Sequence, residues 1–296
     1  MSCKEIRYIC ALEPEFPEKL RNIPSAPQGI YVRGRLPDPE KKTVSIIGSR
    51  NNTEYGRGVA EYFAKTLSGY GVQIVSGMAR GIDGISQMAA VKNGGMSFGI
   101  LGCGIDEVYP PENAGLYKDI LLRGGLISEY PPGTAPRGVL FPQRNRIISA
   151  LSDILLVIEA KAQSGTAITV RFALEQGRDI FAVPGRVTDP LSRGCNRLIA
   201  DGAGIATCPE DILEALGLIE PEKTDGKIVN LGKFGHLSGK QLKIMRCLDY
   251  SPTSVNEIVE KCALSLSEVL TALLKLELKG CVEKAGAGCY ILKMNV

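Results

Sequence analysis

Two turns that contain glycine, each directly after a run of β-prone residues, have the composition of anion-binding loops. The first reads GSR at 48–50 and the second SGMARGIDG at 76–84. In an open α/β sheet, ligands bind beyond the carboxyl ends of the strands, where helix N-termini direct free N–H groups outward. A tight turn at Gly48 and a helix cap by Asp83 are the alternative interpretations. The expected phosphate contacts in these turns are Ser49, Arg50, Ser76 and Gly77.

The stretch FPQRNRIIS at 141–149 combines aromatic, amide and cationic side chains. If its isoleucines form the buried face of a short helix, both arginines sit in the first turn, where cations oppose the macrodipole by about 0.3 to 1 kcal/mol each. A bound phosphate would reverse that penalty, because arginine offers a bidentate fork and the aromatic ring offers a face for base stacking. The alternative is a pair of solvated arginines at a helix start. The expected contacts are Phe141, Arg144, Asn145 and Arg146.

A third group of polar residues, QSGT at 163–166, follows the apolar run at 153–160 and opens a helical pattern. It presents hydroxyl groups and backbone amides at a helix N-terminus, although Ser164 as an ordinary N-cap explains the same residues. The expected contacts are Ser164, Gly165 and Thr166. Because several strand ends carry anion-compatible turns, the pattern favours a ligand with more than one phosphate.

Motifs for cofactors, metals and catalysis are missing from the sequence. The dinucleotide fingerprint G-x-G-x-x-G is absent at the first turn, and GCG at 102–104 lacks the third glycine. The run GHLSGKQ at 235–241 is one residue short of a P-loop. His236 is the one histidine, and the cysteines form no C-x-x-C pair. We therefore expect no metal, no cofactor and no catalytic residue, so the protein is not expected to be an enzyme.

Composition indicates an ordinary globular protein. The sequence is 44% hydrophobic and 23% charged, and no stretch approaches the roughly 20 apolar residues that a bilayer span needs. Nine cysteines without an export signal predict reduced thiols and a cytoplasmic location. The net charge of +3 is only mildly basic, so a contact with nucleic acid requires a local cluster of cations.

Six short runs rich in β-branched residues alternate with helical patterns. The predicted strands are 43–48, 72–77, 96–102, 126–130, 153–160 and 179–185. After the first of them, Val59, Phe63 and Leu67 recur every four residues and predict one buried helix face. Strands that are apolar on both faces and are separated by helices predict an α/β fold, an extended Rossmann-like domain with a mainly parallel sheet.

The rest of the chain divides around this domain, which we place at 43–219. Residues 1–42 are rich in proline and are expected to form an N-terminal arm or short subdomain that packs on the sheet. A polar, glycine-containing stretch at 220–236 is typical of a linker. Three helical patterns and a hairpin around Gly286 and Gly288 then predict a small C-terminal winged-helix-like domain at 237–296.

Taken together, these motifs resemble the bacterial DNA-processing protein A family, also called Smf. The segments that carry the resemblance are GSR at 48–50, SGMARGID at 76–83, LGCGIDEVYPPEN at 101–113, LISEYPPGTAP at 126–136, FPQRNRIISALSD at 141–153, SGTAIT at 164–169, GRDIFAVPG at 177–185 and SRGCNRLIADGA at 192–203. The resemblance covers about residues 12 to 217 strongly and the tail more loosely. Together the motifs are highly specific, although each alone is not.

The resemblance implies a single-stranded DNA-binding protein of natural transformation that protects incoming DNA and loads the RecA recombinase onto it. It also implies a homodimer formed through the Rossmann-like domain. Among the expected contacts, it points most strongly to Ser49, Arg50, Gly77, Phe141, Arg144, Asn145 and Arg146. One departure is visible: where the family usually reads GIDxxAH, this chain reads GIDGISQ, with Ser86 and Gln87 in the last two places.

Two other classes of protein share this kind of fold. A nucleotide N-glycosidase of the lysine-decarboxylase-like group would use a PGGxGTxxE turn, but this chain reads AQSGTAIT with Thr169 in the place of the glutamate. That carboxylate would be needed to stabilise an oxocarbenium-like transition state. A nucleotide-sensing protein is the other alternative.

In the tail, the third helical pattern mixes glutamates with lysines. We therefore expect it to recognise duplex DNA only weakly and favour a protein contact or an autoregulatory role for this domain.

Overall fold

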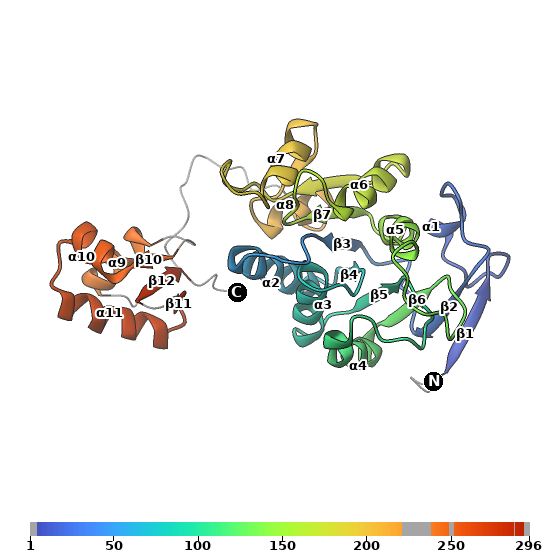
Figure 1. The fold of residues 1–296 in the computed structure, drawn as a ribbon, viewed down its shortest axis with the longest axis horizontal. Coiled ribbons are helices and arrows are strands. Elements are labelled where there is room, and N and C mark those ends of the chain that lie inside the picture. Colours follow the sequence, from blue (N-terminus) through green and yellow to red (C-terminus); the bar gives the residue numbers. More distant parts are fainter. Residues whose placement is uncertain (1–4, 221–237, 249–251, 287, 293–296) are drawn as a thin grey trace. The chain divides into compact units, whose positions relative to one another are not determined.

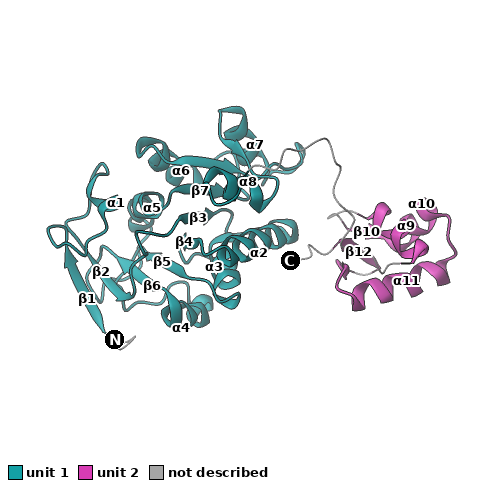
Figure 2. Cartoon of the chain, turned by 180° about the vertical axis from the view of Figure 1, so that it is seen from behind, with its two compact units in different colours: residues 1–220 teal, residues 221–296 magenta. Residues whose placement is uncertain are grey.

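The computed structural model describes residues 5–220, 238–248, 252–286 and 288–292. The chain forms two compact units, residues 1–220 and residues 221–296 (Figures 1 and 2). Each unit has its own hydrophobic core. The expected linker at 220–236 lies outside the described residues, apart from Glu220.

Within residues 5–220, nine strands form one sheet in the order β1-β2-β6-β5-β4-β3-β7-β8-β9. The strands from β6 to β9 in this order are parallel, whereas β1 and β2 pair antiparallel with each other and β2 pairs antiparallel with β6. The predicted mainly parallel Rossmann-like sheet is confirmed. The strands are β1 (Ile6–Cys10), β2 (Gly29–Gly34), β3 (Thr43–Ile47), β4 (Gln73–Ser76), β5 (Ser97–Leu101), β6 (Gly125–Ser128), β7 (Ile154–Val157), β8 (Asp179–Ala182) and β9 (Gly204–Ile205).

Strands β3 to β8 correspond to the six predicted strands. Every residue of β3, β4, β5, β6 and β7 is buried, as expected for a sheet covered on both faces. Three strands were not predicted: β1, β2 and the two-residue β9. The first two lie in the proline-rich segment, and β2 hydrogen-bonds directly to β6, so this segment extends the sheet at its edge.

Helices cover both faces of the sheet (Figure 1). Helices α2, α3 and α4 pack side by side on one face, and α1, α5 and α6 lie on the other. Val59, Phe63 and Leu67 of α2 are all buried, as the sequence predicted. The helices of this unit are α1 (Glu18–Arg21), α2 (Glu54–Gly69), α3 (Ile82–Lys92), the 3-10 helix η1 (Pro111–Asn113), α4 (Ala114–Arg123), α5 (Leu140–Ala150), α6 (Gly165–Glu175), α7 (Arg193–Ala200) and α8 (Pro209–Ala215).

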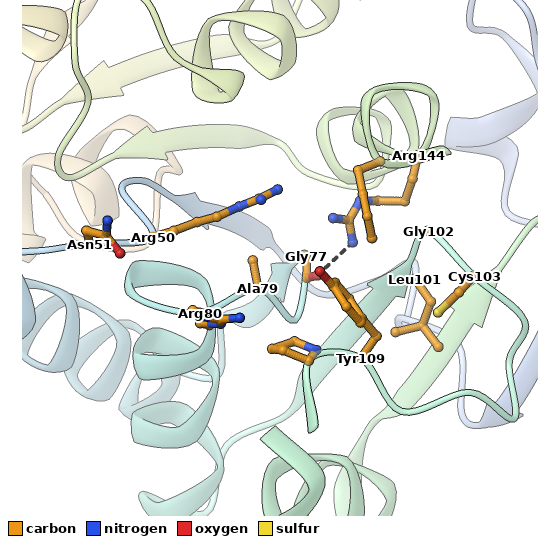
Figure 3. Close-up of a pocket in the computed structure, with 12 residues that line it drawn as sticks. Arg50, Asn51, Gly77, Ala79, Arg80, Leu101, Gly102, Cys103, Tyr109 and Arg144 are labelled. Carbon is orange, nitrogen blue, oxygen red and sulfur yellow. Dashed lines mark hydrogen bonds between the residues drawn. The ribbon is translucent and has the colours of Figure 1, made fainter. Parts of the chain in front are cut away.

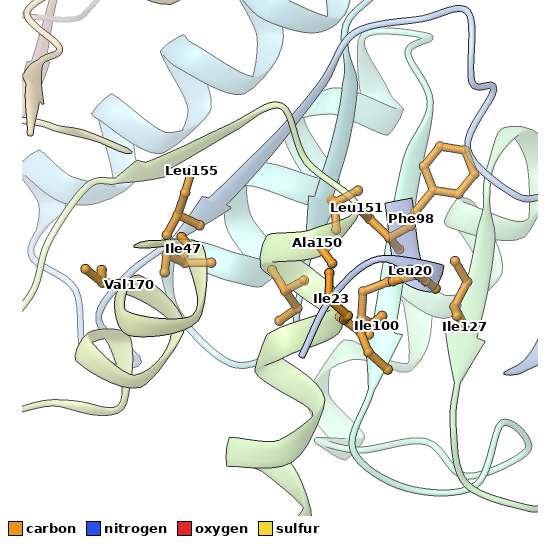
Figure 4. Packing of buried hydrophobic residues seen from close by; sticks show 14 of the residues in the cluster. Leu20, Ile23, Ile47, Phe98, Ile100, Ile127, Ala150, Leu151, Leu155 and Val170 are labelled. Carbon is orange, nitrogen blue, oxygen red and sulfur yellow. The ribbon is translucent and has the colours of Figure 1, made fainter. Parts of the chain in front are cut away.

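The core beneath α5 fixes the helix that carries most of the expected site residues. Leu151 and Ala150, at the end of α5, pack in one cluster with Leu20 of α1 and with Ile100 of β5 (Figure 4). Full burial of an aliphatic side chain of this size contributes about 1.5 to 3 kcal/mol. The orientation of α5 over the sheet is therefore set by its apolar face, and its polar face is held beside the strand ends.

The second unit has the three helices and the hairpin that the sequence predicted, and this part of the fold is confirmed as a winged helix. Its helices are α9 (Gly239–Cys247), α10 (Val255–Cys262) and α11 (Leu266–Leu278), and its strands are β10 (Thr253–Ser254), β11 (Val282–Lys284) and β12 (Cys289–Leu292). The strands pair in the order β10-β12-β11. Each helix begins with a capping box, at Ser238, Ser254 and Ser265, which satisfies the first free amides.

Candidate nucleic-acid interface

The order of the parallel strands reverses between β3 and β7. Strands β4, β5 and β6 follow on one side of β3, and β7 and β8 lie on the other. Ligands of open α/β sheets bind at such a switch point, beyond the carboxyl ends of the strands. A cavity of about 570 Å³ opens there, and a second of about 250 Å³ continues it past the ends of β4 and β5. We call the two together the groove, because they share Arg50, Ala79, Tyr109, Phe141 and Arg144.

The groove brings together nine of the eleven expected site residues. The nine are Ser49, Arg50, Gly77, Phe141, Arg144, Asn145, Ser164, Gly165 and Thr166. They come from the loops after β3, β4 and β7, from α5 and from the start of α6, segments far apart in the sequence. Ser76 and Arg146 do not line it.

Arg50 is the exposed cation at the centre of the groove (Figure 3). It follows β3, and its guanidinium carbon lies 6.0 Å from the centre of the Phe141 ring. Within the described residues, it forms no ion pair with a carboxylate. Its fork of donors is therefore available to an anion entering the groove.

Two stacked aromatic rings form one wall of the groove. The rings of Tyr109 and Phe141 have centroids 5.3 Å apart and planes inclined by 26°. Tyr109 is 38% exposed and comes from the loop after β5, and it was not among the predicted contacts. Its only signal in the sequence was its place in the family motif at 101–113. A surface of this kind suits the stacking of an unpaired base.

Arg144 lies deeper and is engaged by the protein itself. The residue is only 4% exposed, and Nη1 donates to the carbonyl of Gly77 at 2.7 Å and also to the carbonyl of Ile100. Nε donates to Asn145 Oδ1 at 3.2 Å. Burial lowers the pKa of Arg144, and the nearby Asp83 carboxylate counteracts that shift. Arg144 thus ties the ends of β4 and β5 together and contributes positive charge to the floor of the groove.

Helix α5 starts earlier than the sequence analysis assumed. It begins at Leu140, so Arg144 is its fifth residue, and Arg144 and Arg146 both lie beyond the first turn. Pro142 is compatible with this start, because the third residue of a helix has no intrahelical N–H bond to lose. The expected clash between these arginines and the helix macrodipole is therefore wrong.

Arg146 points away from the groove and is held by an internal carboxylate. Nη2 donates to both carboxylate oxygens of Glu129, at 2.7 and 2.8 Å, and Nε donates to the carbonyl of Ser25 at 3.0 Å. The residue is 8% exposed. This geometry argues against Arg146 as a contact for DNA and makes it a link between α5 and the loop before β2.

The glycine loop after β4 uses its polar groups internally. Ser76 is fully buried and donates its hydroxyl to the carbonyl of Ile46 at 2.6 Å, which argues against it as a phosphate contact. The amide of Gly77 donates to Asp83 Oδ2 at 3.1 Å. A Cβ on Gly77 would lie 2.7 Å from that oxygen and 2.9 Å from an Arg144 guanidinium nitrogen, so a larger residue here would displace one of these side chains. Burial raises the pKa of Asp83, and Arg144 opposes the shift.

Gln87 has a structural role at the position where the family usually has histidine. Its Oε1 accepts from the amide of Met78 at 3.1 Å, and its Nε2 donates to the carbonyl of Phe98 at 3.1 Å. The side chain is fully buried. Gln87 thus links the glycine loop to β5 with two neutral hydrogen bonds, and the departure from the motif leaves the loop supported.

The N-terminus of α2, expected to be free for an anion, is occupied by a carboxylate of the protein. Glu159, buried after β7, accepts from the amide and the hydroxyl of Thr53. Thr53 in turn caps α2 by accepting from the amide of Gly56 at 3.0 Å. Burial raises the pKa of Glu159, and the bonds from Thr53 oppose the shift. The helix end therefore offers no open phosphate cradle.

The N-terminus of α6, in contrast, opens into the groove. Ser164, Gly165 and Thr166 all line it. Ser164 is the N-cap residue, yet its hydroxyl caps no amide, and its buried Oγ has no hydrogen-bond partner in the described part of the chain. A side chain at Gly165 would meet nothing within 4 Å. This helix end retains the donors and the space that an anion requires.

Two further cations line the groove and were not predicted. Lys161 follows β7 and is exposed, and within the described residues it has no ion-pair partner. Arg80 lies in the glycine loop and forms a loose ion pair with Glu112 at 3.6 Å. Arg80 belongs to the family segment at 76–83, in which only Ser76 and Gly77 were predicted as contacts, whereas Lys161 lies outside the family segments, between those at 141–153 and 164–169. Together with Arg50, they give the mouth of the groove a positive charge.

The described residues contain neither a metal-binding group nor a helix that could span a membrane. No three His, Cys, Asp or Glu side chains among them come together as a metal-binding group. None of the helices in this part of the chain has the length and the apolar character needed to cross a bilayer.

Comparison with known proteins identifies the family. The model of the family described as DNA recombination-mediator protein A matches residues 7–217, well over half of the chain. The chain belongs to that family. A second model, of the DprA winged helix domain, matches residues 235–288. The family thus accounts for both compact units, and the resemblance in the sequence is confirmed.

Relatives and solved structures agree with this assignment. Protein Smf of Escherichia coli (strain K12) is 36% identical over 292 residues, which cover 95% of this chain and 78% of the relative. DNA processing protein DprA of Bacillus subtilis (strain 168) is 40% identical over 203 residues, 68% of each chain. The structure of DNA processing protein A from Streptococcus pneumoniae superposes with a TM-score of 0.68 at 38% identity and covers 71% of this chain and 74% of its own. That of Helicobacter pylori gives 0.64 at 28% identity, covering 73% and 98%.

Proposed function

We propose that the groove binds single-stranded DNA and performs no covalent chemistry on it. The observation that carries the proposal is the combination, in one groove, of Arg50, which forms no ion pair with the described residues, and the stacked rings of Tyr109 and Phe141. Cations that follow a backbone beside rings that stack on bases are the features with which proteins bind single strands without sequence preference. The solved structure of DNA processing protein A from Helicobacter pylori concerns that protein's single-stranded DNA binding mode, which supports single-strand binding by this chain as well.

Each part of the groove has a distinct role in this proposal. Arg50 and Lys161 contact phosphates from the two sides of the switch point. The free N-terminus of α6 binds another phosphate through its amides and the Ser164 hydroxyl. A base stacks on the exposed part of the Tyr109 and Phe141 pair. Arg144 supports the loops from below.

We propose that the groove catalyses no reaction, because the described side chains that line it lack the groups that catalysis would need. Asp83 is the carboxylate that lines it among the described residues, and this group accepts the Gly77 amide. Thr169, in the place where an N-glycosidase would have its glutamate, lies in the same cavity as a buried alcohol. A hydroxyl there cannot supply the negative charge that an oxocarbenium-like transition state needs.

The binding proposal is tested by fluorescence anisotropy with labelled oligo-dT over a range of salt concentrations. Replacing Arg50 by alanine should weaken binding and lower the slope of log affinity against log salt by about 0.7, the value for one phosphate contact on a single strand. Arg57→Ala is the matched control, because Arg57 is an exposed arginine of α2 that pairs with Glu54 outside the groove. An Arg50→Ala variant that binds like the control would refute the site.

We further propose that the protein is a cytoplasmic homodimer that protects incoming DNA in natural transformation and loads RecA onto it. These finer roles are supported by membership of the family. Light scattering at micromolar concentration should give twice the mass of one chain, and a monomer mass would contradict the dimer. RecA filaments should form faster on single-stranded DNA when the protein is present, and an unchanged rate would contradict the loading role.

A further inference from the structure

A separate cavity lies at the other end of the parallel strands, away from the groove. Its volume is about 260 Å³. Lys41 precedes β3, Gly71 precedes β4, Met96 precedes β5 and Arg123 precedes β6, so the cavity is at the amino ends of these strands. Arg35, which follows β2, completes the wall. We call this the far-rim pocket.

Three cations of the far-rim pocket have no carboxylate partner among the described residues. Arg35, Lys41 and Arg123 are exposed, and within the described residues none of them forms an ion pair. Acidic residues are close in the sequence, since Asp119 lies one turn before Arg123 on α4 and Asp38 is in the loop of Lys41. Asp38 instead accepts the amide of Glu40 at 3.1 Å. In the part of the chain that the structure describes, the three positive charges therefore line one pocket without a neutralising carboxylate.

Glycine turns give the pocket an open floor. Gly71 and Gly94 both have φ of +81°, and a Cβ on Gly71 would meet nothing within 4 Å. At Gly94 the nearest atom to such a Cβ is the guanidinium carbon of Arg123, at 4.0 Å. Arg123 thus lies over a turn that has no side chain of its own, which leaves room for a ligand against the backbone.

We propose that the far-rim pocket is a second anion site, which binds the phosphate group of a nucleotide or of a polynucleotide. Two guanidinium groups and an ammonium group that form no ion pair with the described residues are the donors that phosphate binds best. The volume is below the roughly 300 to 1,000 Å³ of sites that enclose a whole small molecule, so it suits a phosphate group better than a complete cofactor. This site is independent of the groove and of the function proposed for it.

Two sources of phosphate predict different behaviour. If the phosphate belongs to a strand, only an oligonucleotide long enough to leave the groove and reach the opposite rim gains the extra contacts. If it belongs to a free nucleotide, the pocket binds the small molecule by itself and oligonucleotide length has no influence. Both sources require the same three cations.

The variant Arg35→Ala/Lys41→Ala/Arg123→Ala tests the site in the full-length chain. Lys118→Ala is the matched control, since Lys118 is an exposed cation of the same helix α4 that lines neither the groove nor the far-rim pocket. Anisotropy is measured with oligo-dT of about 6 nucleotides, the size of a single site, and of about 30 nucleotides. For the strand source, the triple variant should lower the salt slope by about 2 with the long oligonucleotide, at about 0.7 per contact, and leave the short one unchanged.

Binding of a free phosphate or nucleotide is tested by thermal unfolding of a chain that also carries Arg50→Ala, so that binding in the groove contributes less to any change in Tm. Inorganic phosphate and dTMP should raise Tm, and the three additional substitutions should abolish the increase while Lys118→Ala keeps it. If the triple variant does not fold, Arg123→Ala alone should give about a third of the slope change. The site is supported if the triple variant lowers the salt slope with the long oligonucleotide or abolishes the Tm increase. It is refuted if the triple variant keeps both the wild-type slope and the Tm increase. Since Arg50→Ala acts on the short oligonucleotide, failure of the far-rim pocket and failure of the groove give different results.

Discussion

Arg50 and Arg144 carry the same charge in one groove, but their surroundings give them different roles. Arg50 is exposed and has no ion-pair partner in the described residues, whereas Arg144 is buried and bonded to two strand-end carbonyls. An exposed cation can exchange water for a phosphate at little structural cost. A buried one cannot leave its carbonyls without exposing unsatisfied groups.

The difference predicts that replacement by alanine lowers stability much more at Arg144 than at Arg50. Arg144→Ala should lower the free energy of unfolding by about 3 kcal/mol or more, because the carbonyls of Gly77 and Ile100 and the carboxylate of Asp83 lose their cation at about 1 to 3 kcal/mol per buried group. Arg50→Ala should change it by less than about 0.5 kcal/mol, as an exposed site. Urea unfolding of the two variants measures both values. Equal losses would contradict the structural role of Arg144.

The aromatic wall predicts a loss of affinity without a change in salt dependence. Phe141→Ala or Tyr109→Ala should weaken oligo-dT binding by about 1 to 3 kcal/mol, the contribution of one stacked base, and keep the salt slope of the wild type. Phe141→Tyr preserves the ring and is the control. Anisotropy titrations at two salt concentrations separate the effects. A changed slope would mean that the ring acts through the placement of Arg50.

At the scale of elements, the two helix N-termini beside the groove differ in what occupies them. Glu159 fills the start of α2, whereas the start of α6 retains a buried hydroxyl without a partner. Both helices follow parallel strands with polar turns, so the sequence made them look equivalent. The sequence could not reveal this difference, because Glu159 and Thr53 are 106 residues apart along the chain and meet only in the folded structure.

Glu159 predicts a pH dependence of stability. Its ordinary pKa is 4.5 and burial raises it in the folded protein, so the unfolded chain loses its proton first as the pH rises. The free energy of unfolding therefore falls from about pH 4.5 up to the raised pKa, by at most about 1.4 kcal/mol per pH unit for one proton. Glu159→Gln should flatten this fall, leaving the part due to Asp83. Urea unfolding between pH 4 and 8 measures it, and Glu54→Gln at the exposed start of α2 should keep the full dependence.

The elements were more predictable from the sequence than the site. Strands β3 to β8 and the helices of the winged unit were predicted, because β-branched runs and the period of 3.6 reflect local burial. The groove was located by the rule that parallel strands present their carboxyl ends at one edge. The partners of buried polar groups were missed, since Arg146 with Glu129 and Asp83 with Gly77 depend on how distant or turned segments meet in space.

At the scale of the molecule, each unit has a self-contained core, and the groove belongs entirely to the first. Helix α11 of the winged unit exposes a row of leucines at every fourth position, and its Glu268 pairs with Lys240. The leucines of this row are Leu266, Leu270, Leu274 and Leu278. A helix that reads the major groove needs cations at its surface, so this face is poorly suited to duplex DNA.

Removal of the winged unit should therefore leave single-strand binding intact. A chain ending at Glu220 is predicted to bind oligo-dT within about twofold of the full-length protein and with the same salt slope, because every proposed contact lies before that residue. Anisotropy with the two chains side by side gives the comparison. A tenfold loss in the shortened chain, with its thermal unfolding unchanged, would place DNA contacts in the second unit.

The internal bonds of the glycine loop have a consequence for the thermodynamics of association. Asp83, Gln87 and Arg144 immobilise the loop before any ligand arrives. The loop therefore loses its conformational entropy when the protein folds and not when a ligand binds. Little of the binding free energy is then spent on ordering the protein. The conformational entropy lost on binding then comes mainly from the ligand, so the flexibility of the free ligand would determine the entropy of binding.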